Sequence, residues 1–462
     1  MMPSRFVWIP RVIAMISPLI FAILSSGCTS FAKGVAEAVM GGQGKKEDAR
    51  KCYVRGRPFE GLETKLKRQQ QAAQVSKGDH PVLKVLVVHG IGSHQPGYST
   101  RLAENLAQVL SLNRVQETVK EITITHPKFP DQELGLLRLT RYLNTDEGRE
   151  IIFAELTWNP IVAKEKQTIN FDNSGEYSFR RAPINNIMKV FVNDTIPDVM
   201  MFNGTSRQQI HFSVGQSLCW LMSESWASLQ TKTAQFCDAS VSTSIDRLDD
   251  EFVFITHSLG SRITVDALQW IASLVSDITK PEAAVAGNLQ PLQHAAVTHL
   301  PTKTRSTVIA QKRLLQQKEF TVFMLSNQLP LLQLGQPKPQ VTGRIAEICG
   351  PEAAHETERI FRNTHLIALS DPNDLFSYAL PPSFINEYVD SRLCPTLTNA
   401  ILNVSDVTDI FVGQFANPLA AHTEYDNDPR VIGLIAKGIG HSEVDPEVAE
   451  RCTWLESVPT GQ

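Results

Sequence analysis

Residues 251–261 read Glu-Phe-Val-Phe-Ile-Thr-His-Ser-Leu-Gly-Ser, and this stretch indicates the fold of the chain. Its first half is a short apolar run, as expected of a strand that is covered on both faces of a sheet. Small residues dominate from Thr256 to Gly260, and apolar residues then recur at helical spacing over 263–274. The stretch therefore predicts a strand, a sharp turn and a helix. Ser258 at the turn is either an exposed nucleophile or the N-cap of that helix.

The same pattern occurs upstream of this stretch. Residues 83–88 form an apolar-rich run, residues 89–93 (His-Gly-Ile-Gly-Ser) suit a tight turn, and apolar residues recur at helical spacing over 102–110. Units of this kind build parallel sheets with helices on both faces. We therefore predict a doubly wound, mostly parallel α/β sheet over about residues 81–445. Further strands are expected at 151–156, 252–256, 320–325 and 366–369, with a helix around 210–221.

The composition of the 462 residues is that of a globular protein of enzyme size. Hydrophobic residues make up 42%, and 44 Lys and Arg stand against 48 Asp and Glu, which gives a net charge of -4. A nucleic-acid-binding domain would be strongly basic, so nucleic acid is not an expected partner. A membrane protein with several spans is not expected either. The sequence makes no prediction of the oligomeric state.

Two stretches between the expected strands are longer than a connection in an α/β sheet requires. They cover about residues 157–245 and 275–318. Loops that leave the carboxyl ends of parallel strands overhang the active-site edge, so we expect lid-like insertions there. The first insertion is the stronger candidate for a cover over Ser258, with residues 183–201 as its central segment.

Two later segments offer an acid and a base. Asp371 and Asp374 directly follow the last of the strands expected above. Asp371 precedes a proline and suits a turn in which its carboxylate binds nearby amides, so Asp374 is the preferred acid. His422 lies after the strand-like run 410–415 and before a predicted helix, where a base is expected. The order Ser258, Asp374, His422 is that of hydrolases with a serine on a strand-to-helix turn.

With these motifs the chain resembles the α/β-hydrolases, in particular lipase- or esterase-like bacterial serine hydrolases with an Ala-His-x-x-Tyr motif, here residues 421–425. Thr256 replaces the first glycine of the usual G-x-S-x-G motif. The resemblance implies acyl transfer through a serine ester. His422 would take the proton of Ser258, and Asp374 would orient the imidazole.

The same resemblance implies that the backbone N–H groups of Ile91 and Leu259 bind the developing oxyanion. It implies neither a metal nor an organic cofactor. The implied substrate is a carboxylic ester, a lipidic ester included. Two alternatives stay open at this stage: an acyltransferase that uses the same triad, and a catalytically silent envelope scaffold that binds a partner.

The N-terminus has the layout of a secretory signal over residues 1–27, because basic residues precede an apolar run at 12–24 and small residues follow. Residues 24–28 (Leu-Ser-Ser-Gly-Cys) resemble the lipobox of bacterial lipoproteins, with Ser25 where leucine is usual. The resemblance implies a lipid on Cys28, a membrane contact through that lipid and a place in the bacterial cell envelope, at the periplasmic face of the outer membrane. An ordinary cleaved signal peptide is the alternative.

The segments at the two ends of the mature chain are expected to lie outside the folded domain. Residues 28–80 contain a stretch rich in charged side chains and suit a membrane-proximal tether, which a solvated linker also explains. Residues 446–462 suit a C-terminal tail.

Six cysteines follow Cys28, and an even number in an exported chain fits a set of disulfides. We expect two local pairs and one that joins the ends of the chain, with free buried thiols as the alternative. No two of the six have the CxxC spacing of a zinc or redox site, so no metal is expected. The expected pairs are Cys219–Cys237, Cys349–Cys394 and Cys52–Cys452.

Overall fold

The structure is a computed structural model, and it describes residues 50–75, 81–170, 181–229, 232–235, 237, 250–279, 312–350, 352–410, 413–440 and 443–456. The predicted signal peptide at 1–27 and Cys28 lie outside these residues, as does most of the second expected insertion at 275–318. No helix in the described part of the chain is both long and apolar enough to cross a bilayer.

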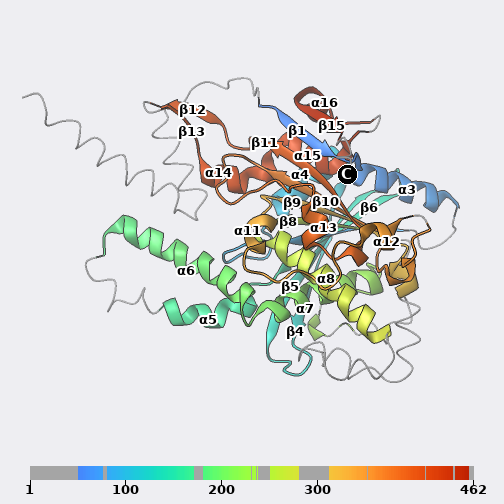
Figure 1. Cartoon of the computed structure of the whole chain (residues 1–462), viewed down its shortest axis with the longest axis horizontal. Coiled ribbons are helices and arrows are strands. Elements are labelled where there is room, and N and C mark those ends of the chain that lie inside the picture. The colour runs from blue at the N-terminus through green and yellow to red at the C-terminus, as the bar shows by residue number, and fades with distance from the viewer. Residues whose placement is uncertain are drawn as a thin grey trace, which may run out of the picture.

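A mixed sheet of 11 strands runs through the described residues (Figure 1). Its centre consists of parallel strands in the order β11-β10-β9-β8-β3-β6. β5 and β4 continue antiparallel beyond β6, while β1 runs antiparallel to β11 at the other side. The prediction of an α/β fold with a mostly parallel sheet is confirmed. In spatial order the strands are β15 (Cys452–Glu456), β1 (Cys52–Gly56), β11 (Pro395–Leu402), β10 (Asn363–Ser370), β9 (Glu319–Leu325), β8 (Glu251–His257), β3 (Leu83–Val88), β6 (Arg149–Thr157), β5 (Glu133–Asn144), β4 (Asn113–Thr125) and β7 (Lys232–Gln235).

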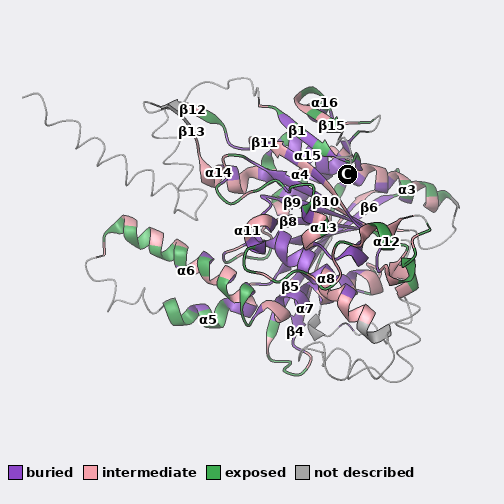
Figure 2. Ribbon diagram, in the orientation of Figure 1, coloured by how far each residue is buried: buried purple, intermediate pink, exposed green. Residues whose placement is uncertain are grey.

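The side chains of β3 show why the central strands carry mostly apolar residues. Leu83, Val85 and Val87 point into one hydrophobic core, and Leu86 and Val88 point into the other. A strand that is covered on both faces has no solvent-facing side, so apolar residues occupy most of its positions. The exception in β3 is the buried Lys84, whose Nζ lies 2.7 Å from Asp250 Oδ2. Burial is accordingly concentrated along the sheet (Figure 2).

Helices cover both faces of the sheet, as the doubly wound prediction requires. One face packs against α3 (Leu62–Val75), α4 (Thr100–Val109), α15 (Pro429–Lys437) and α16 (Pro446–Arg451). The other packs against α7 (Arg207–Ser223), α8 (Leu259–Thr279), α11 (Leu329–Gln333) and α13 (Phe384–Tyr388). The remaining elements are α5 (Pro160–Asn170), α6 (Pro183–Asn203), α12 (Ile345–Cys349), α14 (Pro418–Thr423), the 3-10 turns η3 (Glu356–Glu358), η4 (Ser391–Leu393) and η5 (Glu424–Asn427), and the two-stranded pairs β2 (Phe59–Glu60) with β14 (Gly438–Ile439) and β12 (Val407–Ile410) with β13 (Gly413–Ala416).

The expected strands at 83–88, 151–156, 252–256, 320–325 and 366–369 are all present, as β3, β6, β8, β9 and β10. The run 410–415, expected as a single strand, instead contributes the end of β12 and the start of β13, which pair with each other outside the main sheet. The last parallel strand is β11, which the sequence pattern does not reveal because its residues alternate between buried and half-buried positions.

Residues 50–75 and 443–456 belong to the folded body, so the expected tether over 28–80 and the expected tail over 446–462 are wrong for the residues that the structure describes. β1 pairs with β11 and β15, and Leu62 and Leu66 of α3 are fully buried. The charged side chains that suggested a solvated tether bind the body instead. Lys65 Nζ lies 2.8 Å from Glu251 Oε2, and Arg68 Nε lies 2.7 Å from Glu251 Oε1.

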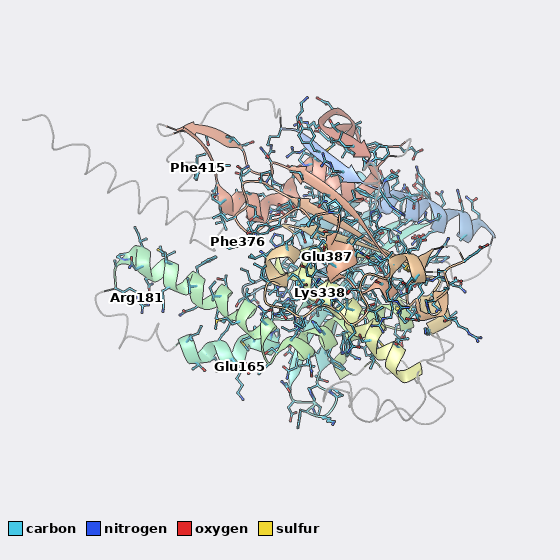
Figure 3. All side chains as sticks on the ribbon, in the orientation of Figure 1. Glu165, Arg181, Lys338, Phe376, Glu387 and Phe415 are labelled. Carbon is cyan, nitrogen blue, oxygen red and sulfur yellow. A yellow bond between two sulfur atoms is a disulfide. The ribbon has the colours of Figure 1, made fainter. Side chains whose placement is uncertain are left out.

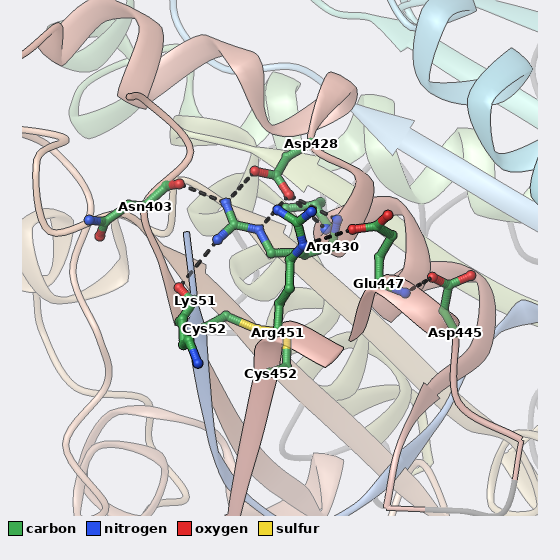
Figure 4. The surroundings of a disulfide bond; sticks show 10 residues. Lys51, Cys52, Asn403, Asp428, Arg430, Asp445, Glu447, Arg451 and Cys452 are labelled. Atoms are coloured by element: carbon green, nitrogen blue, oxygen red, sulfur yellow. Dashed lines mark hydrogen bonds and ion pairs between the residues drawn. A yellow bond between two sulfur atoms is a disulfide. The ribbon is translucent and has the colours of Figure 1, made fainter. Parts of the chain in front are cut away.

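The three predicted disulfides, Cys219–Cys237, Cys349–Cys394 and Cys52–Cys452, are confirmed. The last of these joins the first and last strands of the sheet and closes a loop of 400 residues. Beside it lies the guanidinium of Arg430, which binds the carboxylate of Asp428 and the backbone carbonyls of Lys51 and Asn403 (Figure 4).

The first expected insertion is narrower than 157–245. Helix α7, which lies within this range, is a core helix rather than a cover, because Ile210, Val214 and Leu218 are buried against the sheet. α5 and α6 extend from one side of the body (Figure 1), and the outer part of α6 is largely exposed (Figure 2). Figure 3 shows Arg181 at the outer end of α6 and Phe376 on the side of the molecule from which α6 extends.

We predict that removing the Cys52–Cys452 bond with the double substitution Cys52→Ala/Cys452→Ala lowers the free energy of unfolding by about 2–5 kcal/mol, because the bond restricts a very long loop in the unfolded chain. The control is Cys219→Ala/Cys237→Ala, which opens a loop of only 18 residues and should cost less. Denaturant unfolding under non-reducing conditions measures both. An equal or larger loss in the control would contradict the prediction.

Candidate active site

The candidate site lies where the chain changes direction across the sheet. From β3 the chain continues to β6 on one side, and it later returns to β8 on the other side of β3. In open α/β sheets, ligands bind at the carboxyl ends of the strands at such a switch point. Ser258 directly follows β8, and residues 89–93 directly follow β3, so the two sequence motifs meet there.

Ser258 occupies an unusual backbone conformation at this point. Its φ is 55°, in the left-handed region that a non-glycine residue adopts only at an energetic cost of about 1–2 kcal/mol. Its backbone N–H donates to Leu325 O of β9 at 2.9 Å. Within the described residues its Oγ is buried and has no hydrogen-bond partner, so the hydroxyl does not cap α8. The sharp turn predicted for the serine is therefore present, and its hydroxyl is left available.

Two glycines allow this turn to form. A Cβ on Gly90 would lie 2.6 Å from Ser258 Cβ, and a Cβ on Gly260 would lie 2.7 Å from His89 O. Such distances exclude any side chain at either residue. Thr256, which replaces the glycine usual at that position, is fully buried, and its Oγ1 lies 3.1 Å from both Ser261 Oγ and Phe323 O.

The structure brings Asp374 and His422 together at the ends of neighbouring elements. His422 Nδ1 lies 3.0 Å from both carboxylate oxygens of Asp374. Ser326, at the end of β9, donates its hydroxyl to Asp374 Oδ2 at 2.6 Å and lies 2.9 Å from His422 Nδ1. An imidazole whose single proton lies on Nδ1 presents Nε2 as an acceptor. His422 lies in the short helix α14 rather than on a loop as expected.

The electrostatics of this cluster keep Asp374 charged. Burial by itself would raise its pKa, but hydrogen bonds from His422, Ser326 and the N–H of Phe376 outweigh burial and leave the pKa below its usual value. Burial lowers the pKa of His257, which precedes the serine, to about 3, so this imidazole is neutral. His257 Nε2 donates to the backbone carbonyl of His422 at 2.7 Å and so helps to hold the backbone of His422 in place.

Asp371, the alternative acid, has a structural role in the described geometry. Its Oδ1 accepts from the N–H of Asn373, and its Oδ2 accepts from the N–H groups of Val404 and Ser405. Its own N–H donates to the hydroxyl of Tyr425, the last residue of the Ala-His-x-x-Tyr motif. Asp371 therefore orders the turn after β10, and Asp374 is the carboxylate that contacts His422.

The two residues expected at the oxyanion hole lie on either side of the switch point. Leu259 is buried at the start of α8, where the first N–H groups have no partner within the helix. Ile91 lies in the loop after β3, next to Gly90. The preceding His89 is held rigidly, because its ring stacks on Trp158 with centroids 4.9 Å apart and Trp158 N–H donates to His89 Nε2 at 3.3 Å.

Three of these residues cannot be identified from the motifs alone. Ser326 carries the clearest signal, because it ends the predicted strand 320–325, and parallel strands end at one edge of a sheet. His257 lies inside the serine motif but has no pattern of its own, and Trp158 follows the strand β6 without any motif. Their roles depend on which strands are neighbours.

Comparison with known proteins gives no match, since no family model, no curated protein and no solved structure is similar to the chain. Among the described residues, no three His, Cys, Asp or Glu side chains are grouped so as to hold a metal ion. The interpretation of the site therefore depends on its own geometry.

We predict that Ser258→Gly is more stable than Ser258→Ala by about 1 kcal/mol, because glycine adopts a positive φ without a steric cost. Glu104, exposed on α4, is the matched control. At this helical position Glu104→Gly should be less stable than Glu104→Ala by about 1 kcal/mol. Urea unfolding of the four variants checks both signs. A Ser258→Ala variant as stable as Ser258→Gly would show that residue 258 is unstrained.

Proposed function

We propose that the chain is a serine hydrolase of the α/β-hydrolase type that cleaves carboxylic esters through an acyl-enzyme. The observation that carries the proposal is Ser258 with its positive φ at the switch point, beside a pair formed by the buried Asp374 and the half-buried His422. The strand order supports it as well. Serine, acid and base follow β8, β10 and β11 in chain order, which is the arrangement of that fold.

In the proposed reaction, His422 Nε2 takes the proton of Ser258 as Oγ forms a bond to the ester carbonyl carbon. The N–H groups of Ile91 and Leu259 bind the resulting oxyanion, each of them worth about 3 kcal/mol in the transition state. The protonated His422 then gives its proton to the leaving alcohol, and the C–O bond to the alcohol breaks. A water molecule, deprotonated by the same imidazole, releases the acid and restores Ser258.

The buried cluster supports these roles. Asp374 remains a carboxylate at neutral pH because its pKa is lowered, and it stabilises the imidazolium that forms on His422. Ser326 donates to the second carboxylate oxygen and fixes its orientation. Because Ser258 is only 1% exposed, the substrate enters by displacing surrounding segments, among which α6 is the protruding one.

The test is serine-probe labelling and ester hydrolysis by purified variants. Ser258→Ala should abolish both, and Asp374→Asn should lower turnover by about 10⁴-fold, because it disturbs the His422 tautomer. Asp371→Asn is the matched control and should act on stability, with turnover changed less than about tenfold, since its carboxylate binds the backbone amides of Asn373, Val404 and Ser405. Labelling that persists in Ser258→Ala, or equal losses in the two aspartate variants, would refute the assignment.

We also propose that the protein works in an oxidising compartment, as a lipid-anchored protein of the bacterial envelope. Three disulfides support this location, because such bonds persist outside the cytosol and are rare inside it. Anchoring at Cys28 would place the esterase site near lipidic esters.

To test the anchor, the protein is extracted from bacterial membranes and its intact mass is measured. We expect the wild-type chain to begin at Cys28 and to carry an acyl group. The Cys28→Ser variant should lack both the acyl mass and the membrane association. Finding the wild-type chain unacylated would leave an ordinary secreted protein.

A further inference from the structure

Helix α6 contacts the loop after β3 through two carboxylates. Asp194 and Asp198 are four residues apart and therefore lie on one face of the helix. Asp198 Oδ2 accepts a hydrogen bond from the Gly92 N–H at 2.6 Å, and Asp194 Oδ2 accepts one from the Ser93 N–H at 2.9 Å. Two consecutive amides of the loop are thus bound by an element that is outside the sheet.

A buried lysine completes this contact. Lys166 Nζ, from α5, lies 2.6 Å from Asp198 Oδ1 and donates to the backbone carbonyl of Asp194 at 2.6 Å. The Asp198 side chain is fully buried, and that of Lys166 is 7% exposed. Burial raises the pKa of Asp198, and the charge of Lys166 and the Gly92 N–H act against that rise. A buried ion pair contributes little net stability in general, so its presence beside this loop calls for another reason.

The position of the contact supplies that reason. Gly92 N–H belongs to the peptide unit that links Ile91 to Gly92, so a bond at this N–H fixes the carboxyl end of Ile91. On the other side of Ile91, Gly90 packs directly against Ser258. Ile91 is therefore held between the serine turn and Asp198, and the direction of its own N–H depends on both.

We propose that Asp198 is a positioning residue for the oxyanion hole. Its carboxylate, neutralised by Lys166, holds Gly92 so that the Ile91 N–H points at the carbonyl oxygen of an ester bound at Ser258. The inference rests on the proposed function of Ser258 and assigns part of the oxyanion hole to the inserted helix.

The test compares variants of the full-length protein in ester hydrolysis, with kcat and KM determined separately. Asp198→Ala removes the acceptor for Gly92 and should lower kcat by about 10- to 100-fold with KM changed less than about threefold, because the donor acts mainly in the transition state. Asp198→Asn/Lys166→Met removes both charges and keeps an oxygen acceptor, so it should restore most of the lost kcat.

Asn193→Ala is the matched control. Asn193 is buried on α6 and donates to Ile169 O of α5 at 3.4 Å, so this variant loosens the α5–α6 packing without touching residues 91–93. Amide hydrogen exchange of residues 89–94 should rise in Asp198→Ala and stay unchanged in Asn193→Ala.

The outcomes separate this inference from the proposed function. If the wild type is labelled by the serine probe and hydrolyses esters but Asp198→Ala keeps its kcat, the positioning role is wrong and the hydrolase stands. Equal losses of kcat in Asp198→Ala and Asn193→Ala would also overturn the role, because they would show a general packing effect. A wild type that neither hydrolyses esters nor reacts with the probe would refute the proposed function itself.

Discussion

The backbone at the ends of β3 and β8 packs so closely that only glycine fits at residues 90 and 260, and the candidate site depends on this contact. Because the two parallel strands are neighbours, the turn after one is pressed against the turn after the other. The contact holds Ser258 at its positive φ and keeps its Oγ away from the first turn of α8.

Buried carboxylates order the loops around this contact. Asp198 from α6 and Glu155 from β6 accept backbone N–H groups of the segment after β3, at Gly92 and Ser99. Asp371 likewise accepts the N–H groups of Asn373 in the turn after β10 and of Val404 after β11. Backbone amides donate to each of these carboxylates, and Lys166 is also paired with Asp198, which offsets the cost of burying the charge. Asp374 is different, because most of its partners are side chains, and one of them is the imidazole of His422.

The strands from the two ends of the described chain, β1 and β15, form one edge of the sheet, at the side opposite the α5–α6 extension. Residues 52–56 fit between β11 and β15, and the Cys52–Cys452 bond joins the first strand to the last. α3 then lies across the neighbouring face, where Lys65 and Arg68 bind Glu251 at the start of the serine strand. The segment before the sheet thereby supports the strand that carries Ser258.

The sequence by itself determined the strands that are buried on both faces and the serine turn, because apolar runs and a sharp turn follow from local chemistry. For the cysteines it indicated disulfides, while the pairing of Cys52 with Cys452 follows from the neighbouring strands β1 and β15. The sequence also favoured Asp374 over Asp371, since a proline-adjacent aspartate suits a turn. Only the tertiary structure decided that Ser326 and His257 contact the acid and the base, that β11 is the last parallel strand, and that α6 holds the loop at Ile91. These contacts join residues 48 to 165 positions apart, and strand order and helix packing, which no local pattern encodes, bring them together.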